Sequence, residues 1–140
     1  MTIFSTFDTA GSGLKVMRTW MDAVSDNISN MNDVVRTSDP AFAQRFITAS
    51  AADYGSAGQP GVTAGAKVDG VVFGDTAGRL VSDPNNPLAD ADGMVKYPNI
   101  DLGDQMTQLM VAQRGYQANL AVVDRARDAY QQALSIGKAG

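Results

Sequence analysis

In the last third of the chain, Leu102 to Ile136, a series of residues follow one another at alternating steps of four and three positions, and we call this series the stripe. This spacing lines side chains along one side of a helix, and a sustained period of 3.5 residues lets a second helix pack as a coiled coil. The stripe is Leu102, Met106, Leu109, Gln113, Tyr116, Leu120, Val123, Arg127, Tyr130 and Leu134. At a rise of about 1.5 Å per residue, this helix is roughly 50 Å long and too long to be enclosed by so small a protein. It therefore needs partners.

Residues near both ends of this segment have the properties of helix ends. Asn99 and Asp101 can accept hydrogen bonds from the first backbone N–H groups of a helix. Gly137 stands where a glycine commonly ends a helix. We therefore predict one helix from Leu102 to about Ile136, with Gly137 as its stop.

The first thirty residues repeat the same spacing and offer a first partner. Their stripe is Ile3, Phe7, Ala10, Leu14, Met17, Met21, Val24, Ile28 and Met31. We predict a helix from a cap at Thr2 or Ser5 to about Asn30, with its first turns weakened or separated by Gly11 and Gly13. The two helices can pair as an antiparallel or staggered coiled coil.

The predicted fold is mainly α with a small β element: long N- and C-terminal helices pair as a coiled coil around a central β or irregular segment. The predicted parts are residues 1–32, 33–98 and 99–140. Outside the stripe, Phe4, Val16 and Trp20 form a second apolar face of the first helix. This face either packs on the central segment or contacts another subunit.

The segment from Ser25 to Asn32 contains three asparagines, at positions 27, 30 and 32. Asparagine forms helices poorly because its short side chain bonds to nearby backbone groups. We predict that these residues end the first helix and fix the turn after it. The simpler alternative is an ordinary helix end without a further role.

The central segment has one clear pattern, a period of two from Val62 to Val72. This alternation predicts a strand, and we expect it to pair with residues 79–81 across the turn at residues 74–78. No structure is assigned to residues 33–60, of which 55–61 read as a flexible loop. Residues 82–99 are rich in Asp, Asn, Pro and Gly and predict an ordered loop. They do not match an EF-hand, because Leu88 and Asn99 stand where the calcium ligands belong.

Composition excludes several classes of function. The chain has no cysteine and no histidine, which excludes zinc sites of the usual type, thiol chemistry and histidine-based catalysis. The net charge of −4 and the lack of a basic cluster disfavour nucleic-acid binding. No stretch has the length of a membrane-spanning helix, and we expect no cleaved signal peptide. We predict no catalytic residue, no metal, no cofactor and no small-molecule substrate.

Two other classes of function are open at this point. A small helical adaptor or export chaperone would show the same helical stripes but should be a stable folded monomer or dimer. A hydrolase could use paired carboxylates such as Asp90 and Asp92, but these lie only two residues apart in a loop and nothing else supports the idea.

The residues described above resemble the flagellar basal-body rod protein family over nearly the whole chain, with the closest likeness to a proximal rod protein. The resemblance rests on four segments. They are the asparagine-rich segment 25–32; Asp83, Pro84, Pro87, residues 89–93, Val95 and residues 97–99; Arg114, Tyr116, Gln117, Ala118 and Asn119; and the ending 134–137. The family usually has Thr and a proline- or glycine-rich stretch after the asparagines, where this chain has Asp33 to Arg36.

The resemblance implies a structural subunit of the bacterial flagellar rod in the cell envelope, exported by the flagellar type III system. It implies helical assembly, with the terminal helices as an inner coiled-coil layer that lines the export channel and transmits torque. The central segment would form an outer layer. The implied partners are other rod proteins, copies of the chain itself, and rod-base or export-gate components.

The candidate sites are packing and interface positions. We expect Tyr116, Leu120 and Val123 to hold the two helices together, and Phe4, Trp20, Met110 and Val111 to contact other subunits. Arg127 could pair with an aspartate of a neighbouring helix or simply extend along an edge. The full set is Phe4, Phe7, Leu14, Met17, Trp20, Met21, Val24, Asn27, Ile28, Asn30, Leu102, Met106, Leu109, Met110, Tyr116, Asn119, Leu120, Val123, Tyr130 and Leu134.

Overall fold

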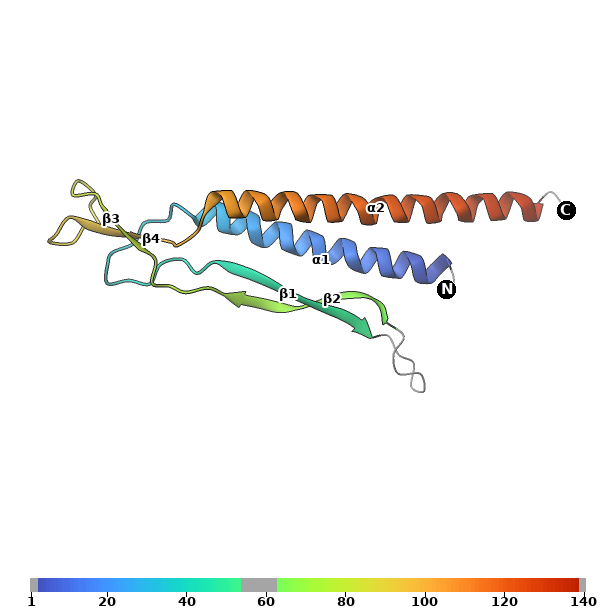
Figure 1. Ribbon diagram of the computed structural model, residues 1–140, viewed down its shortest axis with the longest axis horizontal. Coiled ribbons are helices and arrows are strands. Elements are labelled where there is room, and N and C mark those ends of the chain that lie inside the picture. Colours follow the sequence, from blue (N-terminus) through green and yellow to red (C-terminus); the bar gives the residue numbers. More distant parts are fainter. Residues whose placement is uncertain (1–2, 54–62, 139–140) are drawn as a thin grey trace. The chain divides into compact units, whose positions relative to one another are not determined.

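The computed structural model describes residues 3–53 and 63–138. It contains two long helices that flank four strands in the chain (Figure 1). The elements in order are α1 (Ile3–Asn30), β1 (Arg45–Asp53), β2 (Thr63–Phe73), β3 (Arg79–Ser82), β4 (Met94–Tyr97) and α2 (Leu102–Lys138). The prediction of a mainly helical chain with a small β region is confirmed. The loop predicted at residues 55–61 lies outside the described residues.

The chain divides into two compact units, and each helix contributes to both. The first unit is Met1–Thr19, Thr48–Gly70 and Val111–Gly140. The second unit is Trp20–Ile47 and Val71–Met110. The boundaries therefore fall within helices and strands, and the three parts predicted from the sequence stay a prediction.

Helix α1 is continuous over 28 residues, so the separate first piece expected at Gly11 and Gly13 is not found. Hydroxyl groups inside the helix donate to carbonyl oxygens one turn earlier, as between Thr9 and Ser5 at 2.8 Å. Gly13 lies where α2 approaches closely, since a β-carbon there would lie 2.9 Å from the side chain of Asn119. The helix thus tolerates this glycine because close packing compensates for its low helix propensity.

Helix α2 begins where the sequence predicted. The Asp101 carboxylate accepts a hydrogen bond from the Asp104 backbone N–H at 2.9 Å, which makes Asp101 the N-cap. Asp104 adds a negative charge to the first turn, where it interacts favourably with the helix dipole. The helix extends to Lys138 and includes Gly137, so the predicted stop at this glycine is not found.

The strands form two separate two-stranded sheets, and their pairing differs from the prediction. β2 covers the predicted strand, but it pairs with β1. β3 pairs antiparallel with β4, with Arg79 opposite Tyr97 and Val81 opposite Val95. The pairing of β2 with residues 79–81 was therefore wrong, and part of the predicted loop at residues 82–99 is a strand.

The backbone around residues 74–78 explains why no hairpin forms there. The Gly74 N–H donates to the Gln44 carbonyl at 2.7 Å, and the Ala41 N–H donates to the Thr76 carbonyl at 3.0 Å. This segment therefore continues alongside residues 41–44 instead of folding back on β2.

Each unit has its own set of buried residues. In the first unit these are Ala10, Ser12, Val16, Ala52 and Ala112, and in the second they are Ala23, Val24, Asn27, Ala41, Val95, Pro98, Ile100 and Gln105. Among the described residues, no helix is long and apolar enough to span a membrane.

Candidate interaction surfaces on the two helices

The two helices run antiparallel in each unit. In the first unit, Gly13 lies against Asn119, and a β-carbon at Gly115 would lie 2.7 Å from the Met17 sulfur. In the second unit, the Asn27 side chain donates to that of Gln105 at 3.0 Å, and the Trp20 indole N–H donates to the Gln108 side-chain oxygen at 3.4 Å. Within each unit, residue numbers therefore increase along α1 in the direction in which they decrease along α2.

The side of α2 that packs in the chain is rotated from the predicted stripe. Gln105 and Ala112 are almost fully buried, with exposed fractions of 1% and 0%. Met106 and Leu120, which belong to the stripe, are 47% and 43% exposed. Gln105 and Ala112 each stand one residue before a stripe position, Met106 and Gln113 respectively. The larger side chains of Met106 and Leu120 remain on the surface.

The predicted packing residues of α1 are covered to different degrees. Val24 and Asn27 are buried. The half-buried set is Phe7, Leu14, Met17, Trp20, Met21, Ile28 and Asn30. The indole N–H of Trp20 lies 3.4 Å from the Gln108 side-chain oxygen, so part of this side chain faces α2. The Phe4 side chain lies outside the described residues.

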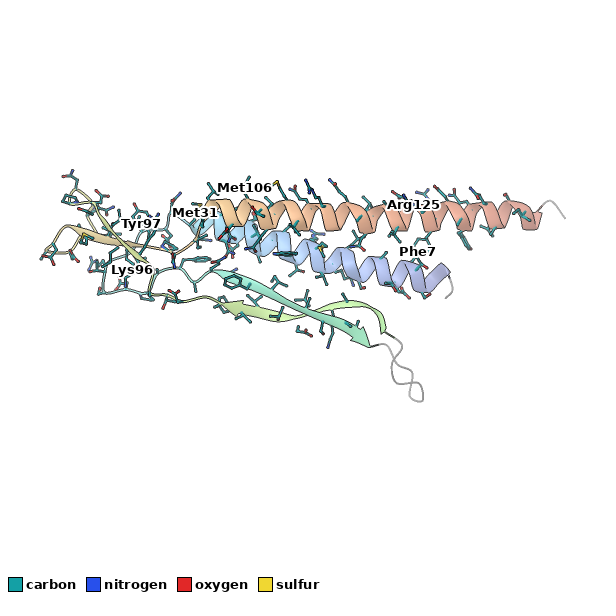
Figure 2. All side chains as sticks on the ribbon, viewed as in Figure 1. Phe7, Met31, Lys96, Tyr97, Met106 and Arg125 are labelled. Carbon is teal, nitrogen blue, oxygen red and sulfur yellow. The ribbon has the colours of Figure 1, made fainter. Side chains whose placement is uncertain are left out.

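The predicted residues of α2 separate into a covered and an exposed group. Leu109, Tyr116, Asn119 and Val123 are half-buried. The exposed group is Leu102, Met106, Met110, Val111, Leu120, Tyr130 and Leu134. Of these, Met106 is labelled in Figure 2. The expectation that Leu120 is covered within the chain therefore differs from the structure.

Three neighbouring residues form a surface that we call the α2 outer surface: Met106, Met110 and Val111. Their exposed fractions are 47%, 49% and 50%. Met106 and Met110 are four residues apart and so lie side by side on the helix surface, and Val111 follows directly at the edge of this pair. Arg127 is also exposed and has no ion pair within the described part of the chain.

An open groove of about 820 Å³ lies in the first unit between α1 and β2. Its lining includes the apolar side chains of Phe7, Val16 and Val68 and the basic side chains of Lys15 and Lys67. The second apolar face predicted for α1 thus packs partly toward the central segment at Val16, which is 8% exposed.

A buried polar cluster in the second unit joins three elements. The Asn27 side chain accepts a hydrogen bond from the Arg45 backbone N–H at 2.8 Å and donates one to the Arg45 carbonyl at 2.9 Å. Its amide also donates to the Gln105 side-chain oxygen. Sequence analysis missed both partners, because an asparagine close to a helix end usually bonds local backbone, as Asn30 does with the Asp26 carbonyl at 2.7 Å.

The loop between β3 and β4 is ordered around Asp90. Its carboxylate accepts hydrogen bonds from the backbone N–H groups of Met94 at 2.9 Å and Asp92 at 3.0 Å, and from the Thr37 hydroxyl at 3.0 Å. The hydrogen bond from the Met94 N–H is the main cause that holds the pKa of Asp90 below its ordinary value of 3.8, and desolvation acts in the opposite direction. Asp90 therefore organises the loop as a carboxylate. Among residues 3–53 and 63–138, no group of acidic side chains could hold a metal ion.

Comparison with known proteins gives one consistent result. Residues 91–136 match the family described as "Flagellar basal body rod FlgEFG protein C-terminal". The flagellar basal-body rod protein FlgC of Salmonella typhimurium is 33% identical over 139 residues, which cover 99% of this chain and 100% of the relative. FlgC of Agrobacterium fabrum is 36% identical over 93% of this chain and 91% of the relative, and FlgC of Bacillus subtilis is 29% identical over 99% and 100%.

Proposed function

This chain belongs to the flagellar basal-body rod protein family, and from that premise we propose that it assembles into the rod through the α2 outer surface. It is a structural subunit of the basal-body rod and not an enzyme. Its partners are other rod proteins and copies of itself, at the flagellar basal body.

The observation that carries the proposal is the exposure of large apolar side chains on α2. Met106, Met110 and Val111 are each about half exposed, although polar residues usually cover a solvated helix. Covering such a patch with a neighbouring subunit removes apolar area from water at about 25 cal/mol per Å². A subunit that must form a stable filament needs a contact of this kind.

We infer a layered arrangement from the family to which the chain belongs. The helices at residues 1–32 and 99–140 form an inner layer that lines the export channel, and residues 33–98 form an outer layer. Repeated contact between unlike surfaces of successive subunits produces a helical assembly, which can transmit torque. Unfolded passage through the type III system to the rod base and its export gate fits helices whose apolar surfaces are only partly covered within the chain.

The test compares matched substitutions on one helix. Met110→Ser and Val111→Ser together remove the apolar patch, and Gln113→Ser with Gln117→Ser change two exposed polar residues of the same helix. In cells that make equal amounts of protein, we expect the first pair to lower incorporation into basal bodies, and motility, at least 10-fold. The second pair should leave both within about twofold.

The same variants can be examined in solution with a purified rod partner. Circular dichroism and analytical ultracentrifugation should show complex formation and a gain of helix for the control pair but not for the Met110 and Val111 pair. Equal assembly of both pairs, in cells and in solution, would rule out the α2 outer surface as the contact.

A further inference from the structure

We propose that Asn27 is the positioning residue that sets the register of α1 against α2 and couples this pairing to the start of β1. The proposal concerns the folding of the chain itself and does not depend on the proposed function. It begins from burial, because Asn27 has an exposed fraction of 0% and Gln105 one of 1%. A buried amide is costly unless its hydrogen bonds are made.

The Asn27 side chain makes the pair of hydrogen bonds that the backbone of a neighbouring strand would make. Its side-chain oxygen accepts from the Arg45 N–H at 2.8 Å, and its nitrogen donates to the Arg45 carbonyl at 2.9 Å. Arg45 is the first residue of β1. One side chain of α1 therefore satisfies both backbone groups at the start of this strand.

The third bond of Asn27 reaches α2. Its nitrogen donates to the Gln105 side-chain oxygen at 3.0 Å, and Gln105 lies in the first turn of that helix. In any other register, at least one of these two amides is buried without its partner or faces an apolar side chain. A single buried polar pair is known to fix helix register in this way, although it does not maximise stability.

The cluster is not completely satisfied. The Gln105 side-chain nitrogen is buried and has no hydrogen-bond partner among the described residues. Leaving a buried donor unpaired destabilises the folded chain. The pair therefore selects one arrangement at some expense of stability, which predicts that two apolar residues could replace it without loss of stability but with loss of register.

An ion pair reinforces the same junction. The Asp26 carboxylate pairs with the Arg45 guanidinium, so two successive residues of α1 hold the first residue of β1. Within the described part of the chain, the side chain of Asn30, by contrast, bonds to its own helix, at Asp26. Asn30→Ala is therefore a matched control from the same asparagine-rich segment.

The first experiment measures backbone hydrogen exchange at Arg45 by NMR in the full chain. We expect the Arg45 N–H to be protected in the parent chain, to exchange about 10- to 100-fold faster in Asn27→Ala, and to change less than about threefold in Asn30→Ala. An unprotected Arg45 N–H in the parent chain, or equal exchange in the two variants, would overturn the proposal.

The second experiment reads the register directly by disulfide trapping, which the absence of cysteine makes unambiguous. Met17→Cys with Gly115→Cys reports the observed register, because these positions are in contact. Met17→Cys with Val122→Cys reports a register shifted by one heptad. In the parent chain the observed pair should form at least 10-fold more disulfide than the shifted pair.

The decisive variant carries Asn27→Leu and Gln105→Leu, and each cysteine pair is introduced into it as well. Its two leucines fill the buried site, so the register can be tested even if Asn27→Ala fails to fold. We expect the urea midpoint of this double-leucine variant to match that of the parent chain within error, while the shifted disulfide increases about 10-fold. If this variant traps only the observed register, Asn27 is an ordinary packing residue and the proposal is wrong.

Discussion

Gly13 of α1 and Asn119 of α2 stand so close that a β-carbon on the glycine would lie 2.9 Å from the asparagine amide. The Asn119 amide also donates to the Gly115 carbonyl at 3.0 Å, so it is held in place on its own helix. A close approach against a fixed group leaves no room for a methyl group.

The first prediction is that Gly13→Ala destabilises the chain. Overpacking costs about 1–3 kcal/mol, and the gain in helix propensity of about 1 kcal/mol offsets part of this. We expect a net loss of about 1 kcal/mol in the free energy of unfolding, measured with urea. Gly11→Ala is the control, since a β-carbon there meets nothing within 4 Å. It should stabilise the chain, so equal effects of the two substitutions would contradict the prediction.

Gly115→Ala should behave differently, although its β-carbon would lie only 2.7 Å from a neighbouring atom. That atom is the sulfur of Met17, a flexible side chain that can adopt another rotamer. We expect the free energy of unfolding to change by less than about 0.5 kcal/mol because the propensity gain balances the rearrangement. Denaturant unfolding checks this, and a loss as large as that of Gly13→Ala would show that Met17 cannot move.

Asp101→Ala should cost about 1 kcal/mol of the free energy of unfolding, because it removes the N-cap of α2. The lost bond is the one that the Asp101 carboxylate accepts from the Asp104 N–H at 2.9 Å. Asp101→Asn keeps a side-chain oxygen and should recover most of the loss. If the alanine and asparagine variants unfold at the same urea concentration, this hydrogen bond does not stabilise the helix.

The sequence predicted the two helices because their evidence is local and repeated. The stripe from Leu102 to Leu134 has the period of a helix, and Asp101 has the chemistry of a cap. Which side of α2 packs could not be predicted in the same way. The period favours the large residues at positions such as Met106 and Leu120, but close approach at Gly115 brings the smaller Ala112 to the contact.

The strand pairing and the buried cluster depend on contacts between residues far apart in the chain. β2 was predicted from its alternation, but its partner β1 has no such pattern in the sequence. Asn27 and Gln105 each precede a stripe residue, and this shared position is the one signal that could have suggested that they meet. Neither side chain alone indicates a partner 78 residues away.

The last prediction concerns acid sensitivity of the loop between β3 and β4. The hydrogen bond from the Met94 N–H holds the pKa of the Asp90 carboxyl below its ordinary value of 3.8, with further support from the Thr37 hydroxyl. A carboxyl group whose pKa is lower in the folded chain than in the unfolded chain stabilises the folded state at pH values above its unfolded pKa. This stabilisation is lost as the pH falls through the pKa of the folded state. The stability difference between the parent chain and Asp90→Asn should therefore be constant near neutral pH and shrink below about pH 4.

Asp92→Asn controls for the change in net charge, because it lies in the same loop and its carboxylate makes no hydrogen bond within the described residues. Urea unfolding of the three chains between pH 7 and pH 3 compares them directly. We expect Asp90→Asn to be less stable than Asp92→Asn at pH 7 and the two to converge at low pH. A difference that persists unchanged at pH 3 would mean that Asp90 supports the loop through its shape and not through its charge.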